Sequence, residues 1–302
     1  MDEIDIALCR MLMWDSRLTY SELAGAVRTS VQTVHRRIKA LTEQGVILGF
    51  EASVSLPAVN GVWVTIFGTS KADSVEKAVA ALVKDDRTDM VFTASGKMLY
   101  VHGALRRLSD LEGYTRFVQK AGSMPDAQIG IMGEVPQVPL ALERPVLYPL
   151  DLKIISALKH DARRPTADLA EELGVAPRTV TRHIERLRKE TLVHFGLPFR
   201  PEVTGDTFAM VHLKVKESVE KEKVALAMVK HMGSRSIISY SFGNIPDLVL
   251  CIVWTHNVKE LREMCQNLES EGTFRSVDPN ILLDASYCHS WLFHYADDNM
   301  KK

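Results

Sequence analysis

Two short stretches of this 302-residue chain carry side chains that could contact the base edges and phosphates of nucleic acid. In the stretch 30–41, Val31, Val34, Ile38 and Leu41 recur at the spacing of a buried helical stripe. The positions between them are cationic or hydrogen-bonding, and none is acidic: Ser30, Gln32, Thr33, His35, Arg36, Arg37 and Lys39. Such a helix suits the major groove of DNA, where arginine, lysine, glutamine and threonine reach bases and phosphates.

The stretch 176–187 repeats this pattern and predicts a second helix of the same kind. Between 178 and 189 there are five lysines or arginines against one acid, and between 28 and 39 there are four and no acid. The formal net charge of the chain is only −1, so basic charge is concentrated where a groove-binding helix needs it. The candidate DNA contacts in this second stretch are Arg178, Thr179, Thr181, Arg182 and Arg186.

No other pattern in the sequence predicts catalysis or a bound cofactor. There is no nucleophile–base set, phosphate-binding loop or zinc-type cysteine spacing, so we expect no enzyme activity, cofactor or metal. Cys288 and His289, with His294 nearby, could form a metal or redox site, although ordinary residues at a strand end explain them better. The arginines and threonines of the two stretches could be solvated helix residues, but their occurrence in two copies favours DNA contact.

The two basic helices belong to an internal duplication that organises the chain. A shift of 146 residues aligns 5–50 with 151–196 without a gap, and eleven of the 46 positions are identical. Each copy opens with two short apolar-patterned helices and reaches the basic helix after a tight turn. Ser30 is a natural N-cap for the first basic helix, and Pro177 suits the first turn of the second. Three short helices with a basic third one predict a helix-turn-helix, followed by a strand or wing at 45–50.

The second part of each copy predicts a different module, in which a strand, a helix, two strands, a helix and a strand follow one another. In the first copy we expect helices at 74–83 and 109–122 and strands at 62–67, 90–95, 98–103 and 127–131. In the second copy we expect helices at 218–231 and 257–269 and strands at 208–215, 237–241, 248–254 and 281–287. This βαββαβ order predicts a ferredoxin-like α+β fold, an antiparallel sheet with both helices on one face. Packing sheet against sheet would cover the open faces.

These elements predict four domains and a linker. We expect helix-turn-helix domains at 1–52 and 150–198, and βαββαβ domains at 58–134 and 204–295. The proline-rich segment 135–149 is expected to be extended and semi-rigid, and the polar residues after about 296 to fray. No apolar run is long enough to cross a bilayer and the N-terminus is acidic, so we expect a cytoplasmic protein.

This layout resembles the Lrp/AsnC family of transcription regulators. In the first copy the resemblance is carried by Ile4-Asp5, Leu8–Leu12, Asp15-Ser16-Arg17, Ser21–Ala24, Thr33-Val34 and Arg36–Ile38. In the second copy it is carried by Leu150-Asp151, Asp161–Arg163, Leu169-Ala170, Leu173–Val175, Arg182 and Ile184. Ordinary members have one copy and form dimers, so the resemblance implies a tandem member whose two copies pair as an intramolecular pseudo-dimer.

The two copies depart from the family pattern in different places. The turn before the third helix usually has a glycine and then a serine cap. The first copy has Ser30 but places Arg28 at the glycine position, and the second has Gly174 but Ala176 at the cap. Each departure costs about 1 kcal/mol, so we expect the two units to bind DNA unequally.

The resemblance also implies a small effector, often an amino acid, bound near the turn between the second and third strands of the module. That turn typically has a glycine followed shortly by an aspartate. The second copy has Gly243, Asn244 and Asp247 there, and the first has Gly96 without a carboxylate.

The sequence therefore predicts a sequence-specific transcription regulator. It should bind an imperfect palindrome in double-stranded DNA, with half-sites roughly 34 Å apart, and form homodimers of the chain. The alternative is an enzyme, because some siroheme decarboxylases of haem biosynthesis resemble Lrp/AsnC proteins. Such an enzyme needs a tetrapyrrole pocket with histidine, arginine and tyrosine groups, whereas the basic third helices favour the regulator.

Overall fold

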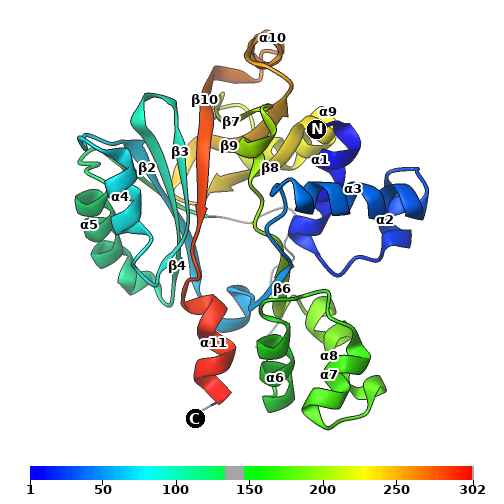
Figure 1. Cartoon of the computed structure of the whole chain (residues 1–302). Helices are drawn as coiled ribbons and strands as arrows, with labels where there is room; N and C mark the ends of the chain where they lie inside the picture. The colour runs from blue at the N-terminus through cyan, green and yellow to red at the C-terminus, as the bar shows by residue number, and fades with distance from the viewer. Residues whose placement is uncertain (133–145, 301–302) are drawn as a thin grey trace.

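The computed structural model describes residues 1–132 and 146–300 (Figure 1). The chain begins with the predicted three-helix unit. The helices are α1 (Glu3–Trp14), α2 (Tyr20–Ala26) and α3 (Val31–Glu43). Asp2, Thr19 and Ser30 cap them, because each side chain accepts a hydrogen bond from a backbone N–H of the first turn. The local start signals in the sequence thus fix where all three helices begin.

A second three-helix unit is formed by α6 (Pro149–Leu158), α7 (Thr166–Leu173) and α8 (Pro177–Lys189). The predicted differences between the copies are confirmed. Arg28 has a φ of 54° where Gly174 has 65°, a left-handed conformation that favours glycine. The Ser30 Oγ accepts a hydrogen bond from the Thr33 N–H at 3.1 Å, whereas Ala176 offers no side-chain cap. The first copy therefore has the better-capped third helix, and the second has the less strained turn.

A βαββαβ module follows each unit, and the predicted α+β fold class is confirmed. The first module contains α4 (Val75–Leu82), α5 (Leu111–Ala121) and strands β2 (Val62–Thr69), β3 (Thr88–Ala94), β4 (Met98–Leu105) and β5 (Gln128–Ile131). The second contains α9 (Lys221–Met232), α10 (Val258–Ser270) and strands β7 (Thr207–Val215), β8 (Ser236–Phe242), β9 (Ile245–Thr255) and β10 (Phe274–Tyr287). The strand orders are β5-β2-β4-β3 and β10-β7-β9-β8, so both modules have the same topology.

The two modules form one eight-stranded sheet whose inner faces pack against each other. Strand β3 of the first module pairs with β10 of the second, and at the opposite edges Met132 forms a bridge with Phe242. Between the faces, Phe67 stacks on Phe242 with ring centroids 5.9 Å apart, and the Tyr100 hydroxyl lies 2.7 Å from His212 Nε2. The predicted packing of sheet against sheet is confirmed, and the edge pairing between the copies adds to it.

Strand β10 is longer than predicted and serves both copies. The sequence predicted a strand at 281–287 as the fourth strand of the second module. In the structure 274–281 pairs with β7, whereas 282–287 pairs with β3 of the first module. The prediction missed the first half because the polar run Asp278-Pro279-Asn280 interrupts the apolar alternation.

The predicted wing at 45–50 is also corrected. The strand that follows the first unit is β1 (Glu51–Val54), and it pairs in antiparallel fashion with β6 (Val193–Gly196) of the second unit. We call this two-stranded sheet the ribbon. Residues 45–50 contact the other copy through loops, where the Leu48 N–H donates to the Pro198 carbonyl at 3.1 Å. The pairing of β1 with the distant strand β6 determines where this strand lies, and no local sequence pattern specifies that pairing.

The C-terminal segment is helical, which corrects the prediction that it frays after about 296. Helix α11 (Trp291–Met300) buries its apolar residues Trp291, Leu292, Phe293 and Ala296. It packs on α6, where Asp297 accepts hydrogen bonds from Lys159 Nζ at 2.7 Å and Ser156 Oγ at 2.5 Å. The helix that ends the second module therefore supports the second helix-turn-helix unit.

Short 3₁₀ turns complete the connections: Pro57–Val59, Ser95–Lys97, Leu108–Asp110, Pro201–Thr204 and Gly233–Arg235. Of the predicted linker at 135–149, residues up to 145 lie outside the described part of the chain, and Pro149 begins α6. In the described ranges, no helix has the length and apolar character needed to cross a membrane.

The missing cap in the second unit leads to a test. We expect Ala176→Ser to stabilise α8 by about 1 kcal/mol, because the new hydroxyl can accept from the Thr179 N–H as Ser30 does from Thr33, in place of the Ala176 carbonyl that accepts from it now at 2.9 Å. Hydrogen exchange of the α8 amides should slow by roughly fivefold. Ser30→Ala is the matched control and should speed exchange in α3 instead. Unchanged α8 exchange in Ala176→Ser would contradict the assigned difference between the caps.

Candidate nucleic-acid interface

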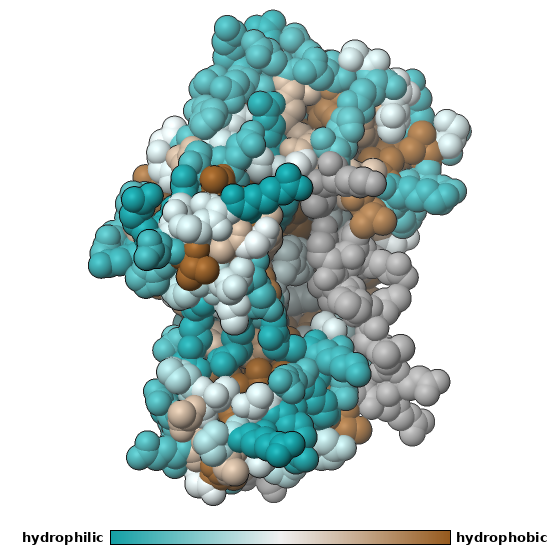
Figure 2. Space-filling view, turned by 90° about the vertical axis from the view of Figure 1, so that its right-hand side faces the viewer, coloured by the Kyte–Doolittle hydropathy of each residue, from teal (hydrophilic) through white to brown (hydrophobic). Residues whose placement is uncertain are grey.

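Helices α3 and α8 lie on the same side of the molecule, with α3 above α8 (Figure 1). Figure 2 looks onto this side and shows a largely hydrophilic surface over both units. The buried stripes are Val34, Ile38 and Leu41 in α3 and Val180, Ile184 and Leu187 in α8. Val31 was predicted to be buried with them but is 47% exposed, because the first turn of α3 extends beyond the core.

Arg36 and Arg182 occupy equivalent positions on these two helices. Both are exposed, and neither makes a hydrogen bond or ion pair with any residue that the structure describes. The preceding equivalent pair, Gln32 and Arg178, is exposed and unpaired in the same part of the chain. Each copy thus presents two long polar side chains one helical turn apart, free to bind a ligand.

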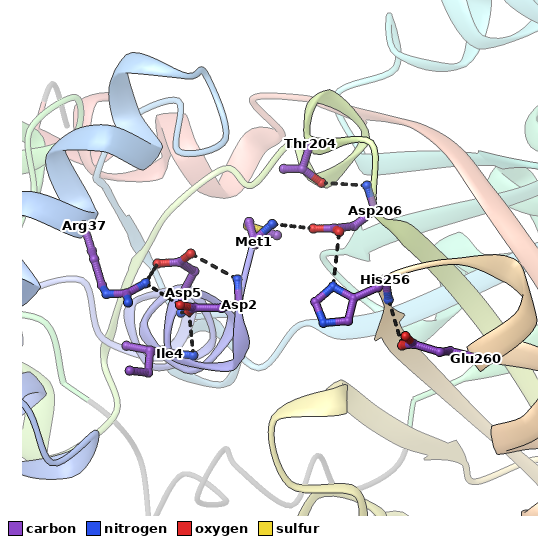
Figure 3. A network of polar contacts seen from close by, with 9 residues as sticks. All are labelled: Met1, Asp2, Ile4, Asp5, Arg37, Thr204, Asp206, His256 and Glu260. Atoms are coloured by element: carbon purple, nitrogen blue, oxygen red, sulfur yellow. Dashed lines mark hydrogen bonds and ion pairs between the residues drawn. The ribbon is translucent and has the colours of Figure 1, made fainter.

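Two other predicted contact residues are held within their own units. Arg37 Nη1 lies 2.8 Å from the carboxylates of both Asp2 and Asp5 (Figure 3). The hydrogen bond to Asp5 raises the pKa of the Arg37 guanidinium. Arg186 pairs in the same way with Asp151, which is the equivalent of Asp5. These ion pairs join the third helix to the first, so we assign Arg37 and Arg186 to positioning the helix.

The short polar side chains of the third helices are satisfied locally. Thr33 Oγ1 lies 2.9 Å from Ser30 Oγ, and Thr181 Oγ1 donates to the Pro177 carbonyl at 3.1 Å. The His35 ring meets the edge of Tyr20 at 5.2 Å between centroids. Thr179 is half-buried at the position equivalent to Thr33, and the exposed Lys39 lies 3.7 Å from Glu43. Among the predicted residues, the free arginines and Gln32 remain the strongest candidates for base contact.

The first unit is anchored on the second module through α1. The N-terminal ammonium of Met1 donates to Asp206 at 2.7 Å, and His256 Nδ1 lies 3.7 Å from the other oxygen of that carboxylate (Figure 3). Arg10, further along α1, donates to the Gly233 carbonyl at 2.6 Å. Because these contacts cross between the copies, the module of the second copy helps to position α3.

A reciprocal pair of arginines joins the two helix-turn-helix units. Arg17 Nη1 donates to the Ala162 carbonyl at 2.5 Å, and Arg163 Nη1 donates to the Ser16 carbonyl at 2.6 Å. Each also donates to the carbonyl two residues further on, at 3.2 and 3.0 Å. The two arginines are equivalent in the duplication, so the contact has pseudo-twofold symmetry. Sequence reasoning missed it, although their identity in both copies was an available signal.

The residues predicted to bind an effector lie in turns that connect the two modules. The Asn244 side chain accepts from the Ile131 N–H and donates to the Ile129 carbonyl, both at 2.8 Å. Asp247 forms an ion pair with Arg275. Gly96 and Gly243 are exposed in the corresponding turns of the two copies. Effector binding at these residues stays a prediction, since the polar groups present are engaged within the chain.

Cys288 and His289 lie between β10 and α11, as expected for the end of a strand. The His289 ring stacks on Phe293 with centroids 3.8 Å apart, and its Nε2 lies 3.3 Å from the Glu51 carboxylate. Burial raises the pKa of the Cys288 thiol to about 12. Throughout the described residues, no group of three or more histidines, cysteines or acids is arranged to hold a metal ion.

Two family models match the chain where the structure places its helix-turn-helix units. One, described as winged helix-turn-helix DNA-binding, matches residues 1–47, and one described as an AsnC-type helix-turn-helix domain matches 149–188. An uncharacterised HTH-type transcriptional regulator of Pyrococcus abyssi is 30% identical over 117 residues, which cover 38% of this chain and 73% of that protein. The HTH-type transcriptional regulator LrpA of Mycobacterium tuberculosis is 30% identical over 103 residues, 33% of this chain and 69% of LrpA.

A solved structure resembles the fold along the entire chain. The siroheme decarboxylase NirDL superimposes with a TM-score of 0.61 at 11% identity, over 100% of both chains. At this identity the likeness shows a shared fold, in which paired helix-turn-helix units and paired modules occur in one polypeptide.

The reciprocal hydrogen bonds of Arg17 and Arg163 predict how the two helix-turn-helix units cooperate in binding DNA. We expect Arg163→Ala to loosen one unit relative to the other and to weaken binding to a duplex with two half-sites by roughly tenfold. Binding to a single half-site should be unchanged, because Arg163 faces the other unit and not the exposed face of α8. Fluorescence anisotropy with duplexes from the promoter region of the protein's own gene measures both.

The matched control for this prediction is Arg164→Ala. Its side chain pairs with Glu172 in the same unit, and its carbonyl remains available to Arg17. If Arg163→Ala weakens binding to both duplexes equally, the reciprocal arginine hydrogen bonds do not set the relative placement of the two units.

Proposed function

The chain belongs to the Lrp/AsnC family of transcription regulators, and we propose that it binds an imperfect palindromic operator as an intramolecular pseudo-dimer. Helices α3 and α8 each enter a major groove, at half-sites about one helical turn, roughly 34 Å, apart. The observation that carries this proposal is the equivalent placement of Arg36 and Arg182. Each is exposed and unpaired within the described chain, on the face opposite the core of its unit.

The unlike residues of the two helices explain why the operator is imperfect. Gln32 suits adenine, to which glutamine can donate and accept at once, whereas Arg178 at the equivalent position suits guanine. Lys39 adds a phosphate contact in the first unit, and Glu185 at the equivalent position would repel phosphate. The two half-sites therefore share the base bound by Arg36 and Arg182 and differ at the neighbouring position.

Further parts of the proposal follow from the family. Two chains associate into a homodimer in the cytoplasm, and a small effector binds at the turns that contain Gly96, Gly243, Asn244 and Asp247. An effector in the second turn would compete with the Asn244 bonds to β5 and so act on the contact between the modules.

The base contacts are tested by substituting the equivalent arginines. If Arg36 and Arg182 each hold a guanine bidentately, Arg36→Ala and Arg182→Ala should each weaken operator binding by about 1–3 kcal/mol and relax specificity at one base pair. Mobility shifts at several salt concentrations measure both effects.

The control for these substitutions is Arg116→Ala on α5, where an equally exposed arginine pairs with Glu112 away from α3 and α8. It should bind like the parent protein. If Arg36→Ala and Arg182→Ala also bind like the parent at every salt concentration, the assignment of α3 and α8 as recognition helices is wrong.

The full-length likeness to a siroheme decarboxylase makes an enzyme the second candidate. Its substrate, a tetrapyrrole with several carboxylates, needs cationic partners. The apolar cavity between the ribbon and the two modules has a volume of about 280 Å³. Its lining includes three histidines and two tyrosines together with Glu51 and Asp89, but no lysine or arginine among its described residues. A cavity of this size and charge disfavours such a ligand, so the regulator is the function that the geometry supports better.

Titration with iron-uroporphyrin III separates the two functions. We expect no saturable change in its visible spectrum, because the two carboxylates repel the porphyrin side chains. Stoichiometric binding of this porphyrin, together with no affinity for promoter DNA, would replace the regulator with the enzyme.

A further inference from the structure

A partly open cavity lies between the ribbon and the inner faces of the two modules. Its volume is about 280 Å³, and its walls come from both copies, including Ser53 of β1, Phe92 of β3, His194 of β6 and Ile252 of β9. Cavities of about 150 Å³ already admit benzene, so this one has room for a bicyclic molecule. Neither the recognition helices nor the turns that contain Gly96 and Gly243 contribute to it.

Two buried polar groups of the cavity wall have no hydrogen-bond partner. His102 is 8% exposed and Tyr240 is 2% exposed, and both line the cavity. In the described structure, His102 Nε2 and the Tyr240 hydroxyl make no hydrogen bond. The nearby Thr65 hydroxyl bonds to His102 Nδ1 at 3.1 Å, and it lies close enough to the Tyr240 hydroxyl to oppose the rise in pKa that burial causes there. Unpaired buried polar groups cost about 1–3 kcal/mol each, so two of them on side chains that line one cavity indicate a ligand that pairs with them.

The charge of the cavity restricts the ligand. Burial lowers the pKa of His102 to about 4, so this imidazole is neutral at pH 7. Burial also raises the pKa of Asp89, another lining residue, to about 6, and the charge of the Glu51 carboxylate adds to this rise. With two carboxyl groups and no lysine or arginine in the described lining, a carboxylate ligand would be repelled.

We propose that this cavity binds a small uncharged molecule with an apolar, ring-sized body and one hydroxyl or carbonyl group. The polar group pairs with His102 Nε2 and the Tyr240 hydroxyl, and the body packs on Phe92, Ile238 and Ile252. The site differs from the effector turns described above, which lie at the ends of strands on the surface.

The position of the cavity gives the ligand a regulatory role, which rests on the proposed function. The ribbon strands β1 and β6 follow the two helix-turn-helix units directly and form one wall. Strands β3, β4, β8 and β9 form the others, together with the ends of α1, β10 and α11. A molecule in the cavity contacts the ribbon and both modules at once. It therefore favours one distance between the ribbon and the sheets, and so one relative placement of α3 and α8.

The direct test is calorimetric titration of the full chain with three probes of one shape. We expect 2-naphthol to bind one molecule per chain, naphthalene to bind roughly three- to tenfold more weakly because it lacks the hydroxyl, and 2-naphthoate not to bind. Ile252→Trp, which fills the cavity, should abolish 2-naphthol binding. Failure of 2-naphthol to bind the folded parent chain, or equal binding of 2-naphthoate, would overturn the proposal.

Comparing phenylalanine substitutions at two buried tyrosines provides the sharpest control. Tyr240→Phe removes an unpaired buried hydroxyl, so it should leave the free protein as stable or more stable while 2-naphthol binding weakens roughly three- to tenfold. Tyr114→Phe removes a hydroxyl that lies 3.1 Å from Thr88 Oγ1 in the outer core of the first module. It should lower the melting temperature and leave 2-naphthol binding unchanged. If Tyr240→Phe binds 2-naphthol like the parent, the polar anchor is wrong.

Promoter binding with and without 2-naphthol tests the regulatory role separately. We expect saturating 2-naphthol to change the affinity of the parent chain for its promoter and to have no effect on Ile252→Trp. Binding of 2-naphthol without any change in DNA affinity overturns the regulatory role. Binding of 2-naphthol by a chain with no affinity for DNA overturns the proposed function and leaves the cavity site in place.

Discussion

The placement of the two recognition helices depends on the reciprocal hydrogen bonds that Arg17 and Arg163 donate to backbone carbonyls across the two helix-turn-helix units. Each guanidinium donates to two carbonyls of the other unit, at distances of 2.5–3.2 Å. Hydrogen bonds from a charged donor to a carbonyl are stronger than neutral ones, and a planar guanidinium fixes their direction. The ribbon runs beside this exchange, and the eight-stranded sheet supports both. In this way a duplicated chain can fix the relative placement of two helix-turn-helix units within one polypeptide. In a dimer, contacts between subunits set that placement.

The two copies keep this shared geometry while they differ in local stability. The first has a serine cap on α3 but a strained Arg28, and the second has Gly174 but no cap on α8. The first unit is anchored on the second module by Met1 and Arg10, whereas α11 supports the second unit. The exposed residues of α3 and α8 differ as well. The asymmetry therefore affects both the stability of each unit and the bases that it would contact.

Local signals in the sequence were sufficient to predict most elements. Capping residues and apolar periodicity predicted the helices of both units and the order of both βαββαβ modules. The predictions failed where distant segments decide the structure: the ribbon, the shared strand β10 and the docked helix α11. At the site, the pattern predicted which face of each helix is basic. It did not distinguish the free Arg36 and Arg182 from the paired Arg37 and Arg186, because the shared partners Asp5 and Asp151 lie on the first helix of each unit.

The cavity behind the ribbon connects these features, because one wall holds the two units together and the others belong mainly to the modules.

In the proposed function, one chain presents two recognition helices at a fixed separation on one face of DNA. Hydroxyl-radical footprinting of the full-length protein on its own promoter tests this claim most directly. Two protected patches about one helical turn apart on the same face are predicted, and they should become unequal at limiting protein. A single protected half-site at saturation would contradict the claim.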